Sequence, residues 1–177
     1  EQIEAHVGDG SMWNLHVQYV REGDELRGTG GALKLAHEQG VLDERFLVIY
    51  GDSYLRCDYR AVFAALDQPD TDAVMTIYRN EGRFDRSNVR YLDGELLYDK
   101  RIDDPAGAGF DYIDYGLSAV KRDAALPKIP AEGRPDLADL YHALSLRGRL
   151  VGFPVAERFY EVGTTEGIAE LERYLAS

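Results

Sequence analysis

Apolar residues recur along this chain with two different periods, and together they predict helices alternating with strands. Residues 46–50 form an unbroken apolar run, which is typical of a strand covered on both faces of a sheet. Further strands are predicted at residues 15–20, 72–78, 112–120, 150–155 and 159–162. Apolar positions three and four residues apart predict helices at residues 30–38, 59–66, 135–147 and 165–175.

Local signals refine this pattern at three places. Residues 88–92 and 95–98 flank Asp93-Gly94, a pair that favours a hairpin turn. Asp58 is expected to be the N-cap of the helix that follows it. The first residues are typical of the end of an amphipathic helix that stops at Gly8. The alternation of helices and strands predicts an α/β fold with a mixed sheet between helical layers.

Composition limits the function classes. The 177 residues, 45% of them hydrophobic, suffice for one core, and we expect a single domain over residues 1–177. Asp and Glu number 32 against 20 Lys and Arg, so the net charge is -12 and no nucleic acid polymer is expected as a partner. Cys57 is the only cysteine, which favours a reducing cytoplasm. No apolar run approaches the ~20 residues of a membrane span, so no membrane partner is expected.

The candidate chemistry begins with one short succession. Gly28-Thr29-Gly30-Gly31 opens a predicted helix, and the strand at residues 46–50 runs directly into Gly51-Asp52. Glycines before a helix offer backbone N–H groups to an anion. An acidic residue just past the carboxyl end of a strand lies where open α/β sheets bind ligands. The succession therefore predicts a phosphate-bearing ligand together with a divalent cation.

A dinucleotide-binding fold, and hence an oxidoreductase, is a second interpretation of the same residues. Gly28 and Gly30 open a helix, and Asp52 follows a strand about 20 residues later, as that fingerprint requires. Two features disfavour it. Leu33 stands at the third glycine position, and the polar residues 21–27 separate the preceding predicted strand from the glycines.

Five stretches in order resemble the sugar-1-phosphate nucleotidyltransferases. They are residues 26–33 around the glycine turn, 46–53 ending in Gly-Asp-Ser, 97–100 (Leu-Tyr-Asp-Lys), 112–117 (Tyr-Ile-Asp-Tyr-Gly-Leu) and 159–164 (Phe-Tyr-Glu-Val-Gly-Thr). The resemblance covers nearly the whole chain and leans toward the short single-domain members that act on hexose, heptose or N-acetylmuramate 1-phosphates.

The resemblance implies a nucleotide-diphospho-sugar transferase-like fold, which is a three-layer α/β/α structure with a mixed, mostly parallel sheet. Members of the family begin with a strand and a Gly-rich loop that grips the nucleoside triphosphate. Nothing before Glu1 supplies these parts, so we expect an N-terminally truncated domain whose N-terminal strand is missing. An incomplete sheet edge would favour pairing with another chain, for example in a homo-oligomer.

The implied reaction transfers a nucleotidyl group from an NTP to a sugar 1-phosphate and yields an NDP-sugar and pyrophosphate. A phosphate monoester has a second pKa of about 6, so the nucleophile is already mostly dianionic near neutral pH and needs no general base. Positioning and charge neutralisation must then supply most of the rate. Mg²⁺ is the implied cofactor, because it takes oxygen ligands from carboxylates, phosphates and water.

The resemblance also assigns roles to residues. Asp52, Lys100 and Glu161 are the expected catalytic residues; Asp52 and Glu161 would hold the metal, and Lys100 would neutralise the sugar phosphate. The nucleotide side is expected to consist of Gly28, Thr29, Gly31 and Asp52. The sugar side is expected to consist of Asn88, Asp99, Lys100, Asp114 and Gly116. A metal held by both carboxylates requires that the two strand ends be adjacent, and the family more often has Asp at the position of Glu161.

Each of these residues also has an ordinary structural interpretation. Asp52 could be a turn residue, and Glu161 could face solvent at a strand end. Lys100 could be a solvated surface residue, and Gly116 could form a β-bulge. The glycine turn could simply begin a helix. The corresponding alternative function is a catalytically inactive subunit of the same fold that binds a sugar nucleotide or regulates a partner. The sequence names neither the sugar nor the base.

Overall fold

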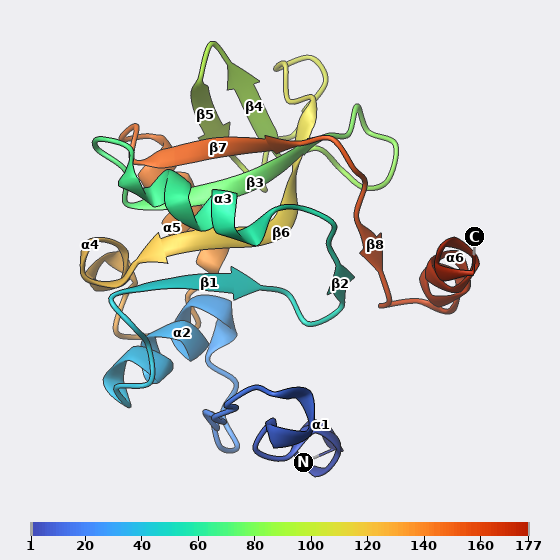
Figure 1. The fold of residues 1–177 in the computed structure, drawn as a ribbon. Coiled ribbons are helices and arrows are strands. Elements are labelled where there is room, and N and C mark those ends of the chain that lie inside the picture. The colour runs from blue at the N-terminus through green and yellow to red at the C-terminus, as the bar shows by residue number, and fades with distance from the viewer. Residues whose placement is uncertain (1, 177) are drawn as a thin grey trace.

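The computed structural model describes residues 2–176, and its centre is a six-stranded sheet (Figure 1). The strands follow the order β5-β4-β6-β3-β7, and β1 pairs with β6 as well. Their bounds are β1 Arg45–Ile49, β3 Ala73–Arg79, β4 Val89–Leu92, β5 Glu95–Tyr98, β6 Tyr112–Lys121 and β7 Leu150–Val155. The predicted hairpin is present as β4 and β5, with both Asp93 and Gly94 at positive φ.

The long strand β6 determines the pairing of the sheet. It runs antiparallel to β1 and β4 along one edge and antiparallel to β3 along the other. β3 and β7 are parallel. The α/β class with a mixed sheet is confirmed. Parallel pairing among the described residues is limited to β3 and β7, which is less than the mostly parallel sheet predicted, because β6 runs in the opposite direction between β1 and β3.

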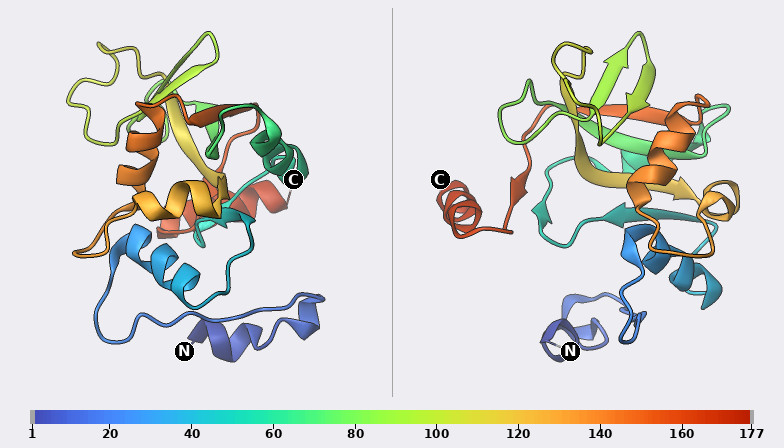
Figure 2. Two further views of the ribbon diagram at one scale, coloured as in Figure 1. Left: turned by 90° about the vertical axis from the view of Figure 1, so that its left-hand side faces the viewer. Right: turned by 180° about the vertical axis from the view of Figure 1, so that it is seen from behind.

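Helices cover both faces of the sheet. The α-helices are α1 Gln2–Val7, α2 Gly28–Glu38, α3 Tyr59–Ala64, α4 Arg122–Ala125, α5 Leu137–Ser145 and α6 Thr165–Leu175. Short 3-10 turns lie at η1 Ser11–Trp13, η2 Ala65–Asp67 and η3 Leu126–Lys128. Figure 2 shows α5 and α3 on opposite sides of the sheet.

Two hydrophobic clusters fill the space between these layers. Along β3, Ala73, Met75 and Ile77 belong to the cluster that includes α5, whereas Val74 belongs to the cluster that includes α3. This alternation is the expected consequence of successive strand side chains pointing to opposite faces. The three-layer arrangement thus follows directly from the period-2 pattern of the strand.

Two predicted helix boundaries, the N-cap Asp58 and the stop at Gly8, agree with the structure. The Asp58 carboxylate accepts hydrogen bonds from the backbone N–H groups of Arg60 and Ala61, which confirms it as the N-cap of α3. α6 has the predicted bounds, and the Thr164 hydroxyl caps it by accepting from the N–H of Gly167. α1 ends at Val7, and Gly8 follows at φ 59°, as its role as a stop requires.

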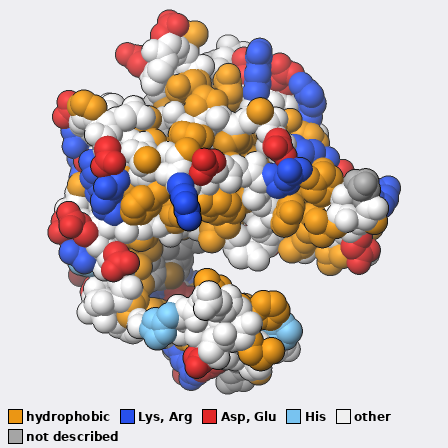
Figure 3. Space-filling view, viewed as in Figure 1, with side chains coloured by type: hydrophobic (Ala, Val, Ile, Leu, Met, Phe, Trp, Pro, Cys, Tyr) orange, Lys and Arg blue, Asp and Glu red, His pale blue; other side chains and the backbone are white. Residues whose placement is uncertain are grey.

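The strand predicted at residues 15–20 is wrong: no strand is assigned there. Val17 and Tyr19 instead bond back to the N-terminal segment, through Val17 N–H to the Asp9 carbonyl and Tyr19 hydroxyl to the Gly8 carbonyl. Alternating side chains stabilise a strand only when a neighbouring strand completes the ladder. Ile3, Met12, Trp13 and Leu15 are exposed, and the space-filling view shows this segment set apart from the main body (Figure 3).

A second, two-stranded sheet lies apart from the main one. β2 Ser53–Tyr54 pairs antiparallel with β8 Tyr160–Glu161, which is the shortened form of the strand predicted at residues 159–162. α6 packs beside β8, and the rings of Tyr160 and Tyr174 stack with their centres 4.6 Å apart. None of the helices described over residues 2–176 has both the length and the apolar character needed to span a bilayer.

Candidate functional site

The pairing of β2 with β8 brings Asp52 next to Glu161. Ser53 lies opposite Glu161 in this pairing, and the N–H of Val162 donates a hydrogen bond to the Asp52 carbonyl with an N···O distance of 2.8 Å. The pKa of Glu161 is raised, first by partial burial and then by the negative charges of Asp52 and Asp85. The two strand ends are therefore adjacent, which is the geometric condition that a shared metal requires.

Two carboxylates suit a magnesium ion whose remaining ligands are phosphates and water. They do not suit a metal that is held by protein ligands alone. No group of three or more His, Cys, Asp or Glu side chains suited to a metal occurs among residues 2–176. Mg²⁺ usually takes only one or two carboxylates and completes its shell with phosphates and water. A cation beside Asp52 and Glu161 would also offset their mutual repulsion, which contributes to the raised pKa of Glu161. The role of these residues as ligands remains a prediction.

Asp114 occupies the centre of the predicted sugar side. Its carboxylate accepts hydrogen bonds from the Gly116 N–H, at 3.0 Å, and from the Tyr50 hydroxyl. Burial raises the pKa of Asp114 to about 6, although these two hydrogen bonds and the positive charge of Lys100 act in the opposite direction. A carboxyl group with this pKa changes its charge close to neutral pH.

Gly116 lies at an irregularity between β3 and β6. The register changes between Met75 and Ile77, a shift that is compatible with the β-bulge expected as the alternative for Gly116. Its φ of +97° is a conformation that side chains rarely adopt. A Cβ atom at Gly116 would lie 3.4 Å from the Tyr50 ring and 3.5 Å from the Ser53 hydroxyl oxygen. The close approach seen here is by these two side chains, and a sugar contact remains a prediction.

Asn88 connects the backbone of two other residues of the predicted sugar side, Asp114 and Asp99. Its side-chain oxygen accepts from the backbone N–H of Asp114 at 2.9 Å, and its carbonyl accepts from the N–H of Asp99 at the same distance. The Asp99 carboxylate in turn accepts from the N–H of Arg101 at 2.8 Å. Asn88 thus has a clear structural role at the junction of β4, β5 and β6.

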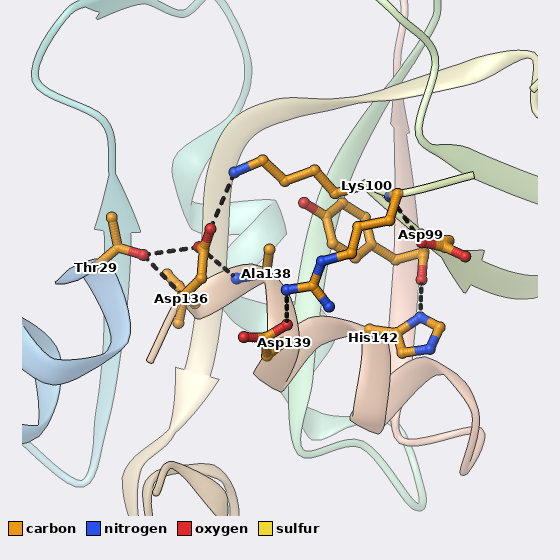
Figure 4. A network of polar contacts seen from close by, with 10 residues as sticks. Thr29, Asp99, Lys100, Asp136, Ala138, Asp139 and His142 are labelled. Carbon is orange, nitrogen blue, oxygen red and sulfur yellow. Dashed lines mark hydrogen bonds and ion pairs between the residues drawn. The ribbon is translucent and has the colours of Figure 1, made fainter. Parts of the chain in front are cut away.

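Lys100 is paired with a residue that sequence reasoning missed, Asp136 (Figure 4). The Lys100 ammonium lies 3.0 Å from Oδ2 of Asp136. Oδ1 of Asp136 accepts from the Thr29 hydroxyl at 2.9 Å and from the Ala138 N–H at 3.0 Å, so Asp136 is also the N-cap of α5. Partial burial acts to raise the pKa of Asp136, but the Ala138, Lys100 and Thr29 contacts outweigh it and lower that pKa.

The glycine turn packs against the same segment. The N–H of Gly30 donates to the Pro135 carbonyl at 2.9 Å, so the expectation that this amide is free for an anion is wrong. Cβ atoms at Gly28 and Gly30 would come within 2.8 and 2.9 Å of that carbonyl oxygen, and one at Gly31 within 2.8 Å of Arg27 Cβ. Close packing at a helix start therefore explains the glycines, and contacts of Gly28, Thr29 and Gly31 with a nucleotide remain a prediction.

Two residues of the site were not identified from the sequence. Asp136 carried a usable signal, because an Asp directly before an apolar helical run is a favoured N-cap. Tyr50 carried no such sequence signal. It is the last residue of an apolar run, where a residue of the hydrophobic core is also expected. Burial, the charges of Asp114 and Asp136, the hydrogen bond with Asp114 and the charge of Asp52 all raise the pKa of Tyr50. Tyr50 therefore lies close to Asp114 and within the electrostatic reach of Asp136 and Asp52.

No protein-family model matches the chain. A solved structure that resembles it is that of a protein assigned as a glucose-1-phosphate thymidylyltransferase from Bacillus anthracis, in complex with sucrose. The TM-score is 0.79 at 17% sequence identity, and the match covers 98% of this chain and 70% of the other. The chain has a nucleotidyltransferase-like α/β fold. At 17% identity the structural similarity shows the fold only. The function has to be argued from the residues of the site.

Proposed function

We propose that this domain transfers a nucleotidyl group from a nucleoside triphosphate to a sugar 1-phosphate. The observation that carries the proposal is the pairing of β2 with β8, because it joins the backbone segments that carry Asp52 and Glu161, two acidic residues from distant parts of the sequence. The order of motifs and the nucleotidyltransferase-like fold support the same reaction.

In this reaction an oxygen of the sugar phosphate forms a bond to the α-phosphorus, and the bond to the bridging oxygen of the departing pyrophosphate breaks. The chain must therefore bring two polyanions together in line. Lys100 would reduce the charge of the sugar phosphate. Mg²⁺, held by Asp52 and Glu161, would offset the charge of the triphosphate when bound. The half-buried Asp99 and Asp114 are acceptors suited to sugar hydroxyl groups.

Pyrophosphate release tests this function. The longest natural form of the protein is incubated with Mg²⁺ and a panel of NTPs and sugar 1-phosphates; dTTP with glucose 1-phosphate is the first pair to try, given the name of the similar structure. We expect turnover with at least one pair and its loss in Asp52→Ala. Glu166→Ala is the matched control, because Glu166 is an exposed acid in the first turn of α6.

The inactive subunit is distinguished by the same experiment. Absence of turnover with every pair contradicts the proposal. Calorimetric binding of an NDP-sugar in that case would favour the sugar-nucleotide-binding or regulatory subunit. Turnover that persists in Asp52→Ala would equally contradict the proposed role of that carboxylate.

A further inference from the structure

We infer that Asp136 is a positioning residue that holds Lys100 in place for the phosphate group of the sugar substrate. This inference rests on the proposed function, in which Lys100 neutralises that phosphate. Asp136 lies outside the five motifs, and its link to Lys100 exists only in the folded chain.

The Asp136 carboxylate is itself held firmly. Its Oδ1 atom accepts two hydrogen bonds, from the Thr29 hydroxyl and the Ala138 N–H. The Thr29 oxygen also accepts from the Leu137 N–H at 2.8 Å, so the hydroxyl hydrogen is directed at Asp136. Oδ2 remains for Lys100, at 3.0 Å. A carboxylate with this many fixed partners gives the lysine a defined anchor.

Lys100 needs such an anchor because its side chain is 61% exposed. Lysine is a compact charge on a flexible stem, and in solvent it samples many rotamers. Its ammonium has three N–H donors, so the bond to Asp136 leaves two for phosphate oxygens. The bond to Asp136 already restricts the Lys100 side chain, so Lys100 loses less conformational freedom when phosphate binds. It also leaves Lys100 with N–H donors for the phosphate.

Removing the Asp136 charge has two opposing effects on a phosphate ligand. The negative charge that repels the phosphate disappears, which would strengthen binding. The orientation of Lys100 is lost as well, which weakens binding. Asp136 and Lys100 already neutralise each other, so the repulsion is small, and we expect the loss of orientation to dominate. The direction of the change therefore separates a positioning role from simple repulsion.

The chain offers a closely matched control pair. Arg101 and Asp139 are the next ion pair along the same two segments, with Nη2 and Oδ1 separated by 2.6 Å. The side chains of Arg101 and Asp139 are 76% and 45% exposed, and those of Lys100 and Asp136 are 61% and 39% exposed. Asp139→Asn therefore removes an equivalent exposed ion pair from the same helix and leaves Lys100 with its partner.

The test compares KM values for the sugar 1-phosphate and for the NTP in wild type, Asp136→Asn, Thr29→Val and Asp139→Asn. Asparagine is also a good N-cap, so Asp136→Asn retains the start of α5; an unchanged melting temperature checks this. We expect Asp136→Asn to raise the sugar 1-phosphate KM about two- to fivefold, as for an exposed ion pair, and to leave the NTP KM unchanged. Thr29→Val should shift the same KM in the same direction, and Asp139→Asn should shift neither.

The outcomes separate this inference from the proposed function. If wild type turns over and Asp136→Asn behaves like Asp139→Asn, or lowers the KM, the positioning role alone is overturned. If wild type binds glucose 1-phosphate in a calorimeter without turnover, the proposed function fails, and a weaker Kd in Asp136→Asn than in Asp139→Asn still supports the positioning role. If wild type neither turns over any sugar 1-phosphate nor binds glucose 1-phosphate, both are overturned.

Discussion

The backbone carbonyl of Asp52 accepts a hydrogen bond from the N–H of Val162, with 2.8 Å between oxygen and nitrogen. This bond joins the turn after β1 to the segment that carries Glu161, so the predicted metal site is formed from the middle and the end of the chain. α6 packs against β8, and the packing of this C-terminal segment therefore supports the position of Glu161.

The first prediction concerns the metal. Glu161→Gln keeps the size of the side chain and removes its charge, so we expect the Mg²⁺ concentration for half-maximal turnover to rise roughly tenfold or more. Glu161→Asp should retain more activity, since the sugar-1-phosphate nucleotidyltransferases that the sequence resembles more often have Asp at this position. Titrating MgCl₂ into the pyrophosphate assay measures both. An unchanged Mg²⁺ requirement in Glu161→Gln, matching a Glu166→Gln control, would remove Glu161 from the metal site.

The second prediction concerns pH and Asp114. Burial raises its pKa to about 6 in the folded protein, above the usual value near 3.8. The unfolded chain therefore loses this proton at lower pH than the folded protein does. The contribution of Asp114 to stability is greatest at acidic pH, declines from about pH 4 to pH 6, and stays unfavourable above that window.

Asp114→Asn removes this unfavourable contribution. We expect the variant to be more stable than wild type at pH 7, by roughly 1–3 kcal/mol, and to lose the advantage below pH 4. Urea unfolding at several pH values measures the difference. Asp111→Asn, at an exposed position in the same segment, is the control and should leave the pH profile unchanged. A less stable Asp114→Asn at pH 7 would show that the ionised carboxylate is favoured in the fold.

The third prediction concerns Gly116. Alanine at φ +97° is strained whatever the space around it, so Gly116→Ala should lower the free energy of unfolding by about 1–3 kcal/mol. Gly51→Ala should change it little, because Gly51 has no positive φ and no atom within 4 Å of an added Cβ. Urea denaturation of the two variants distinguishes them. Equal stability would mean that the bulge adapts to a side chain.

The sequence predicted regular elements well where the signal is local. The helix at residues 165–175 has both a capping Thr164 and a clear apolar period, and its bounds agree with the structure. The strand at residues 15–20 has the period but no neighbouring strand in the described chain, so its alternation alone was misleading.

The candidate site was predictable only in part for a related reason. The N–H of Gly30 is occupied by Pro135, and Lys100 is paired with Asp136; both partners are distant in sequence. No local pattern reports such contacts. The adjacency of Asp52 and Glu161 was expected only as a requirement of the family resemblance, and it is the pairing of β2 with β8 that produces it.

The fourth prediction concerns the attachment of the C-terminal segment. The Arg158 guanidinium lies 4.2 Å from the centre of the Phe84 ring and 4.4 Å from that of Tyr160, and it forms a two-bond ion pair with Glu170. Lysine cannot reproduce this planar stacking. Arg158→Lys should speed hydrogen exchange in β8 and α6 about fivefold, which corresponds to ~1 kcal/mol of local stability.

Arg173→Lys is the control for this exchange measurement. Its guanidinium donates to the carbonyl of Ala169 within the same helix, so this bond does not join α6 to another element. Exchange in β8 should therefore stay at the wild-type rate. If Arg158→Lys and Arg173→Lys gave the same exchange pattern, the attachment of β8 would depend on contacts other than Arg158.

The central claim is that Asp52 and Glu161 together support nucleotidyl transfer to a sugar 1-phosphate. The most direct measurement is mass-spectrometric detection of the NDP-sugar, alongside pyrophosphate, in reactions of wild type, Asp52→Asn and Glu161→Gln with Mg²⁺. We expect equal amounts of both products from wild type and a large loss of both in each variant. Pyrophosphate without an NDP-sugar, or full product formation in either variant, would contradict it.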